Sequence, residues 1–78
     1  MNKQRRKVIN ELIEQAQELS SKIEEVLNEE QDYFDYMPEN LQNSERGQNA
    51  EEAICNLEEA QGNIEDCISN LESAIEMQ

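Results

Sequence analysis

The chain has 78 residues, with nineteen acidic and six basic side chains and a formal net charge of −13 at pH 7. A chain of this length forms one domain with a small core, which seldom outweighs the entropy lost on folding without a staple or self-association. The acidity excludes nucleic acids and acidic membranes as direct partners of the body of the chain. No apolar run approaches the ~20 residues of a membrane span.

Residues 3–36 follow a seven-residue pattern of apolar positions, labelled a to g, that is typical of one long amphipathic helix. Position a holds Ile9, Ala16, Ile23, Glu30 and Met37, and position d holds Leu12, Leu19, Val26 and Tyr33. Only Glu30 interrupts the apolar series. Pro38 ends the pattern, because it disfavours helical geometry at Met37 and has no backbone N–H to donate. The sequence therefore predicts a first helix over about residues 3–36.

Residues 37–44 are predicted to reverse the chain. Ser44 is a typical N-cap residue whose hydroxyl can accept from the first amides of a new helix. Glu45 follows it directly, and a carboxylate in the first turn is favoured by the helix dipole. A second helix is therefore expected from about residue 45 to residue 77.

All three aromatic side chains, Tyr33, Phe34 and Tyr36, lie just before this reversal. Tyr33 and Phe34 are expected to close the end of the bundle, where Glu30 weakens the apolar seam. Tyr36 falls at position g and needs no burial. Tyr36 with Met37 is therefore a candidate anchor for a partner protein.

The second segment is a repeat of seven residues, AEEAICN, LEEAQGN, IEDCISN and LESAIEM. Position a holds Ala50, Leu57, Ile64 and Leu71, and position d holds the small residues Ala53, Ala60, Cys67 and Ala74. Large residues at a with small residues at d allow a partner helix to approach closely. Two matched helices joined by a short connection predict an all-α, coiled-coil-like antiparallel hairpin, which forms a single domain over residues 1–78.

Folding the chain near residue 40 brings together residues whose numbers add up to about 81. The basic residues between positions 3 and 7 then lie beside Glu72 and Glu76, at the negative end of the second helix. Charge pairing within the hairpin is therefore preferred to nucleic-acid binding as the role of this basic cluster.

Antiparallel pairing sets e positions against e and g positions against g. The g edge is polar, and its column of Asn49, Asn56, Asn63 and Asn70 is expected to fix orientation, or alternatively to offer a hydrogen-bonding ladder to a ligand. The e edge is apolar and carries Ile13, Leu27, Phe34, Ile54, Ile68 and Ile75. This apolar oligomer edge makes the stripe too wide for two helices, so the sequence predicts a homodimer that closes into a four-helix bundle.

The sequence argues against an enzyme, a metal site or a cofactor. It has no histidine and no glycine-rich phosphate loop. Six carboxylates fall at the solvent-side positions b and c of the second helix, where they form an acidic strip of Glu51, Glu52, Glu58, Glu59, Glu65 and Asp66. Cys55 and Cys67 are roughly 18 Å apart on one helix, too far for a disulfide within the chain, and free thiols fit a reducing cytoplasm.

Residues 32–60, DYFDYMPENLQNSERGQNAEEAICNLEEA, contain MPENLQ and SERG followed by a Glu-rich heptad helix. This segment resembles small acidic helical proteins of bacterial phages and mobile elements. The resemblance implies a location in the cytoplasm of a bacterial host. It also implies a role as an inhibitor of a host nuclease or DNA-binding protein, of the anti-CRISPR or anti-restriction type.

The acidic strip repeats two carboxylates every ~10 Å along its helix. It is expected to imitate DNA and to compete for the basic groove of a nucleic-acid-binding protein. The alternative is a structural or adaptor bundle that binds a partner helix through the apolar oligomer edge, with the acidity serving solubility. A small-ligand site at a dimer interface is a third possibility, which no convergent polar pocket supports.

Overall fold

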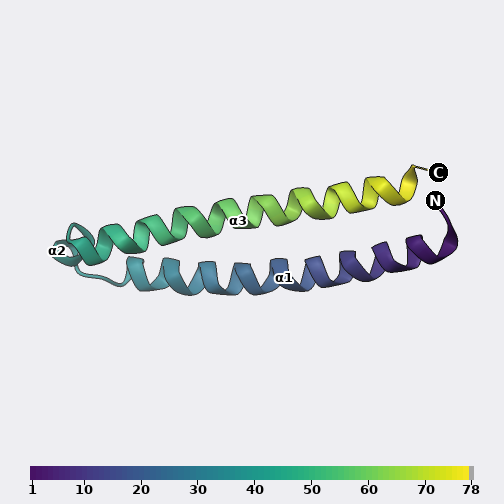
Figure 1. Ribbon diagram of the computed structural model, residues 1–78. Coiled ribbons are helices and arrows are strands. Elements are labelled where there is room, and N and C mark those ends of the chain that lie inside the picture. Colours follow the sequence, from purple (N-terminus) through teal and green to yellow (C-terminus); the bar gives the residue numbers. More distant parts are fainter. Residues whose placement is uncertain (78) are drawn as a thin grey trace.

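The computed structural model describes residues 1–77 and contains three helices, α1 (Lys3–Asp35), α2 (Glu39–Gln42) and α3 (Glu45–Glu76). Helices α1 and α3 run side by side in opposite directions, so that both ends of the chain lie at one end of a rod and α2 lies at the other (Figure 1). The rod measures 58 × 15 × 12 Å. The predicted all-α helical hairpin is therefore confirmed, with a short helix in the reversal that the sequence pattern did not indicate.

Helix α1 begins with a side-chain cap. The Oδ1 atom of Asn2 accepts a hydrogen bond from the Arg5 backbone N–H at 2.8 Å, which satisfies one of the amides that a helix start leaves without a partner. The last turn closes at Tyr36, whose N–H donates to the Asp32 carbonyl at 3.0 Å. Helix α1 thus ends just before Met37 and Pro38, as the proline requires.

The reversal is held by backbone hydrogen bonds around Pro38. The Pro38 carbonyl accepts from the amides of Leu41 and Gln42 at 2.9 and 3.0 Å, which forms the single turn of α2. The Gln42 side chain donates from Nε2 to the Phe34 carbonyl at 3.1 Å and ties this turn to the end of α1. The connection is therefore a structured turn.

Ser44 is the N-cap residue of α3, but the expected cap hydrogen bond is not formed. Its hydroxyl donates instead to the Leu41 carbonyl. The carbonyl at the end of α2 is the nearer partner, because only two residues separate the two helices. Ser44 therefore links α2 to α3 and leaves the first amides of α3 without a side-chain acceptor.

The two long helices pack through positions a and e. The buried apolar side chains are Ile13 and Ile54 at e and Ala16 and Ala50 at a. Leu27, Phe34, Ile68 and Ile75 at e are half-buried, whereas Leu12, Leu19, Val26 and Tyr33 at d are exposed. The prediction that position d lies in the seam of α1 and position e outside it is therefore wrong.

The side chains of α3 explain this rotation. Its large apolar residues lie at a and e, where Leu57, Ile64 and Leu71 alternate with Ile54, Ile68 and Ile75, while its d column after Arg46 holds only alanine and cysteine. Turning the a and e columns inward removes more apolar area from water than turning d inward, and burial contributes roughly 25 cal/mol per Å². The facing helix rotates to match, which leaves its own d column outside.

The pairing of the two helices follows the predicted fold of the chain about residue 40. Gln61 of α3 donates from Nε2 to the Ser20 hydroxyl of α1 at 2.7 Å, and both residues lie at position e in the seam. The Oε1 atom of Gln61 is buried without a hydrogen-bond partner. The polar pair occupies two positions of the seam at mid-rod and separates the apolar side chains of the seam into two groups.

Candidate interaction surfaces

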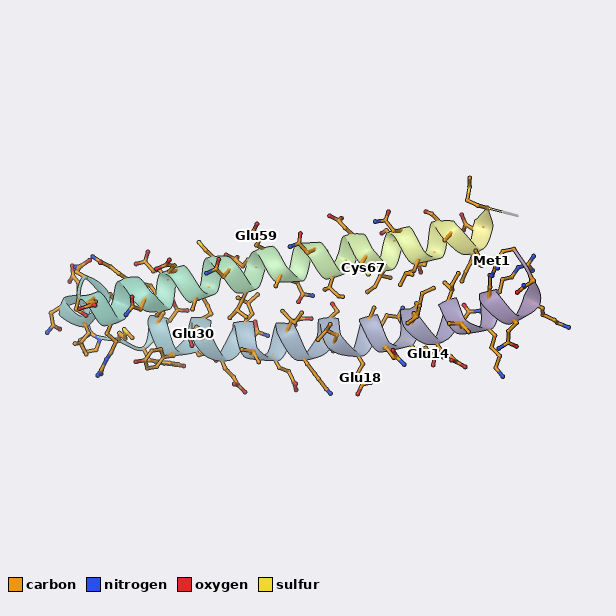
Figure 2. All side chains as sticks on the ribbon, in the orientation of Figure 1. Met1, Glu14, Glu18, Glu30, Glu59 and Cys67 are labelled. Atoms are coloured by element: carbon orange, nitrogen blue, oxygen red, sulfur yellow. The ribbon has the colours of Figure 1, made fainter. Side chains whose placement is uncertain are left out.

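All six residues of the acidic strip are exposed. They lie on α3, and Glu59 projects away from α1 (Figure 2). Within residues 1–77, none of the six side chains forms an ion pair or a hydrogen bond, whereas Lys22 on α1 forms an ion pair with Glu18 at 3.5 Å. The six negative charges are consequently compensated only by solvent and counterions.

The apolar oligomer edge predicted from the sequence does not lie on the surface. Ile13 and Ile54 are 9% and 7% exposed and belong to the core. The other four residues of this edge are half-buried between α1 and α3. The correction follows from the rotation of the seam, which turns position e inward, so these side chains hold the hairpin together and offer a second molecule much less surface than the sequence predicts.

A different apolar surface is exposed, which we call the apolar face. It is formed by the d columns of both helices, Leu12, Leu19, Val26 and Tyr33 of α1 and Ala53, Ala60, Cys67 and Ala74 of α3. The four α1 side chains are between 42% and 50% exposed. The three alanines are half-buried and Cys67 is exposed.

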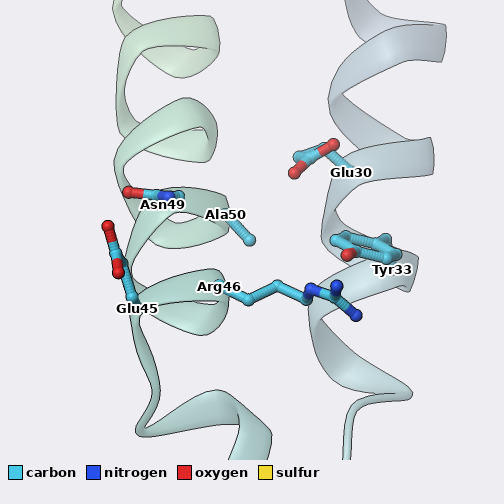
Figure 3. Close-up of a pocket in the computed structure, with 6 residues that line it drawn as sticks. All are labelled: Glu30, Tyr33, Glu45, Arg46, Asn49 and Ala50. Carbon is cyan, nitrogen blue, oxygen red and sulfur yellow. The ribbon is translucent and has the colours of Figure 1, made fainter.

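An open groove near the reversal establishes that the two d columns belong to one face. Tyr33 and Arg46, both at position d, line this groove of about 410 Å³ together with Glu30, Glu45, Asn49 and Ala50. Arg46 extends from α3 towards Tyr33 of α1 (Figure 3). A second groove, lined by Gln31, Phe34, Glu51, Ile54 and Cys55, brings together the b columns instead. The hairpin therefore has an apolar d face and, on its other side, a b face with acidic residues.

The two residues of the candidate anchor at the reversal differ in exposure. Tyr36 is 87% exposed, whereas Met37 is half-buried. Both line a shallow groove with Tyr33, Pro38, Leu41 and Arg46. Tyr33, which was expected to close the end of the bundle, is 48% exposed on the apolar face, because position d points outward.

The basic residues near the N-terminus lie at the same end of the rod as the end of α3 (Figure 1). Arg6 donates to the Met1 carbonyl at 3.4 Å. Glu72 and Glu76 form no ion pair within the described chain, so the expected pairing between the basic cluster and these two side chains does not take the form of direct salt bridges.

The cysteines and the acidic side chains were also examined for convergence. Both cysteines are free and exposed. Over residues 1–77, no three acidic or cysteine side chains converge in a way that would hold a metal ion. No helix in the described part of the chain has the length and apolar character that crossing a bilayer requires.

Comparisons with family models, with curated proteins and with solved structures found no match for this chain.

Proposed function

We propose that this chain is a non-enzymatic protein-interaction module that inhibits a basic nucleic-acid-binding protein through the acidic strip of α3. The observation that carries the proposal is the set of six exposed carboxylates along one continuous helix, none of which has a side-chain partner within residues 1–77. A host nuclease or a DNA-binding protein is the partner class that the resemblance of residues 32–60 implies.

The strip suits a basic groove for electrostatic reasons. Its carboxylates recur in pairs every seven residues, or about 10 Å, on a helix that holds them at fixed spacing. A groove that binds DNA is lined with cations and attracts such a row, and release of counterions makes the attraction depend steeply on salt. The strip lies at b and c, away from the apolar face at d, so either surface can be used without covering the other.

Two hairpins are further proposed to pair into a four-helix bundle. Four apolar side chains are buried in the described chain, and two of them are alanines. A core of this size is small for a chain of 78 residues, since ordering costs roughly 1.5 kcal/mol per residue. Pairing would bury more apolar surface and would place two acidic strips on one rod.

A second candidate function is supported by the apolar face. A structural or adaptor module would use this face to capture a helix of another protein, with the acidity serving solubility. Such binding would persist in high salt, because it depends on apolar burial rather than on charge.

The test is a pull-down from bacterial lysate with the tagged chain, eluted in salt steps and challenged with DNA. The acidic variant carries Glu58→Gln, Glu59→Gln and Glu65→Gln, and a matched variant removes the same charge from α1 by Glu11→Gln, Glu14→Gln and Glu25→Gln. We expect the native chain to retain a nucleic-acid-binding protein that moderate salt or added DNA releases. The variant with three substitutions on α3 should no longer bind this protein, whereas the matched α1 variant should still bind it. Retention through high salt, or equal loss by both variants, would contradict it.

A further inference from the structure

The apolar face has no partner in the hairpin, although four of the large apolar side chains that are exposed in residues 1–77 lie on it. Its α1 column, from Leu12 to Tyr33, extends over roughly 32 Å at 1.5 Å per residue. Surface leucines and valines are common singly, but a continuous stripe of them marks an interaction site. Such a stripe is expected to be covered by a partner molecule.

The distribution of charge favours a second copy of the same chain. Each copy carries a net charge of −13, so association through any acidic face would place like charges together, which is unfavourable. The eight residues of the apolar face are uncharged. The g columns beside it are Asn49, Asn56, Asn63 and Asn70 on α3 and Gln15, Lys22 and Glu29 on α1, which together add no net charge. Two copies can therefore meet here with the acidic strips kept away from the contact.

The sizes of the side chains favour the same partner. The d column of α1 is large and the d column of α3 is small, so the face has a ridge of Leu12, Leu19, Val26 and Tyr33 beside a furrow of alanines and Cys67. A two-fold contact places the same patch against itself, with each ridge in the other copy's furrow. Close approach of helices across small residues is the geometry that such packing requires.

The available area is also sufficient. The rod is 58 Å long and 15 Å wide, so one face is on the order of the ~800 Å² per partner that a standard stable interface buries. We infer that the apolar face is the homodimer interface, with α1 of one copy packed on α3 of the other. This inference rests on the proposed four-helix bundle and replaces the apolar oligomer edge as its contact.

The two native cysteines provide an internal test without substitution. Cys67 lies on the apolar face, whereas Cys55 lines the groove on the b face, and both are exposed in the single hairpin. Sedimentation equilibrium first locates the concentrations at which the native chain is monomeric and dimeric. Pulsed alkylation with a maleimide, read by peptide mass spectrometry, then gives the rate at each thiol across that range.

The inference expects the Cys67 rate to fall by about tenfold or more relative to the Cys55 rate as the dimer forms, because only the dissociated fraction reacts. A dimer in which Cys67 stays as reactive as Cys55, or in which Cys55 alone is protected, would overturn the assigned face while leaving the bundle intact. A monomer at high micromolar concentration would overturn both the bundle and this inference, and would assign the face to a different protein.

Discussion

Gln61 and Ser20 are joined by a hydrogen bond of 2.7 Å across the seam between α3 and α1. The contact spans 41 residues of sequence and lies half-way along both helices. A one-turn slip of either helix would break it and would leave polar atoms buried without partners, which costs more than the bond itself contributes. The pair therefore fixes the register of the hairpin, although it replaces apolar packing at mid-rod.

Ser20→Ala should lower the free energy of unfolding by about 1–2 kcal/mol, because it leaves the Gln61 amide without its acceptor. The double variant Ser20→Ala with Gln61→Leu should recover that loss, since both polar groups are then gone and apolar area is buried. Urea unfolding followed by circular dichroism, at one fixed protein concentration, measures both values. A double variant less stable than Ser20→Ala alone would show that the Ser20–Gln61 pair stabilises the hairpin more than apolar side chains at the same positions do.

Ile54→Ala should destabilise the hairpin by about 2–4 kcal/mol, because Ile54 is buried at position e and its truncation leaves a cavity. The neighbouring substitution Cys55→Ala is the control, since the exposed thiol packs little, and its effect should stay within about 0.5 kcal/mol. Thermal unfolding monitored by helicity compares the two. Equal destabilisation by the two substitutions would indicate that position e does not lie in the seam.

The two glycines should respond to alanine with opposite signs. A Cβ at Gly47 would overlap the backbone carbonyls of Gln42 and Leu41, whereas a Cβ at Gly62 meets nothing within 4 Å. Gly62→Ala should stabilise α3 by about 0.5–1 kcal/mol through helix propensity. Gly47→Ala should destabilise the protein, because α2 packs against α3 at that point. Chemical unfolding distinguishes the signs, and a stabilising Gly47→Ala would contradict the close packing of the reversal.

Packing the ridge of one copy into the furrow of the other places both reversals at the same end of the bundle. A spin label at Asn40→Cys, in a background of Cys55→Ala and Cys67→Ala, should therefore give an interlabel distance below about 30 Å, the width of two helices plus the label arms. A two-fold axis across the rod would instead separate the labels by nearly its 58 Å length. Pulsed electron paramagnetic resonance separates the two arrangements, and the longer distance would contradict packing of α1 on α3.

The hairpin itself was predictable from sequence, because Pro38 and two heptad patterns of equal length leave few other arrangements. The rotation about the helix axes was harder to predict. Three columns of α1, at a, d and e, are mostly apolar, and a period of seven does not say which two of them face the partner helix. The decisive signal was the contrast within α3, where all the isoleucines and leucines lie at a and e, and d carries small residues after Arg46.

The two predicted interaction surfaces depend on that rotation to different degrees. The acidic strip was correctly predicted to be exposed, because b and c point outward in either seam. The apolar oligomer edge was misplaced, because the e column depends on which neighbouring column it packs with. The Asn2 cap and the short helix α2 within the reversal could not be predicted from the sequence, since a cap in the first residues and a four-residue helix leave no periodic signal.

Sedimentation equilibrium of three chains tests whether two hairpins pair through the apolar face. The native chain is compared with Leu19→Glu on the apolar face and with Gln17→Glu, which adds the same charge to an exposed position on the b face of α1. We predict that the native chain and Gln17→Glu sediment as dimers of two 9.1-kDa chains and that the dimers become more stable as salt screens the repulsion between the copies. Leu19→Glu should remain a folded monomer. A monomeric native chain at high micromolar concentration, or a Leu19→Glu chain as dimeric as Gln17→Glu, would contradict it.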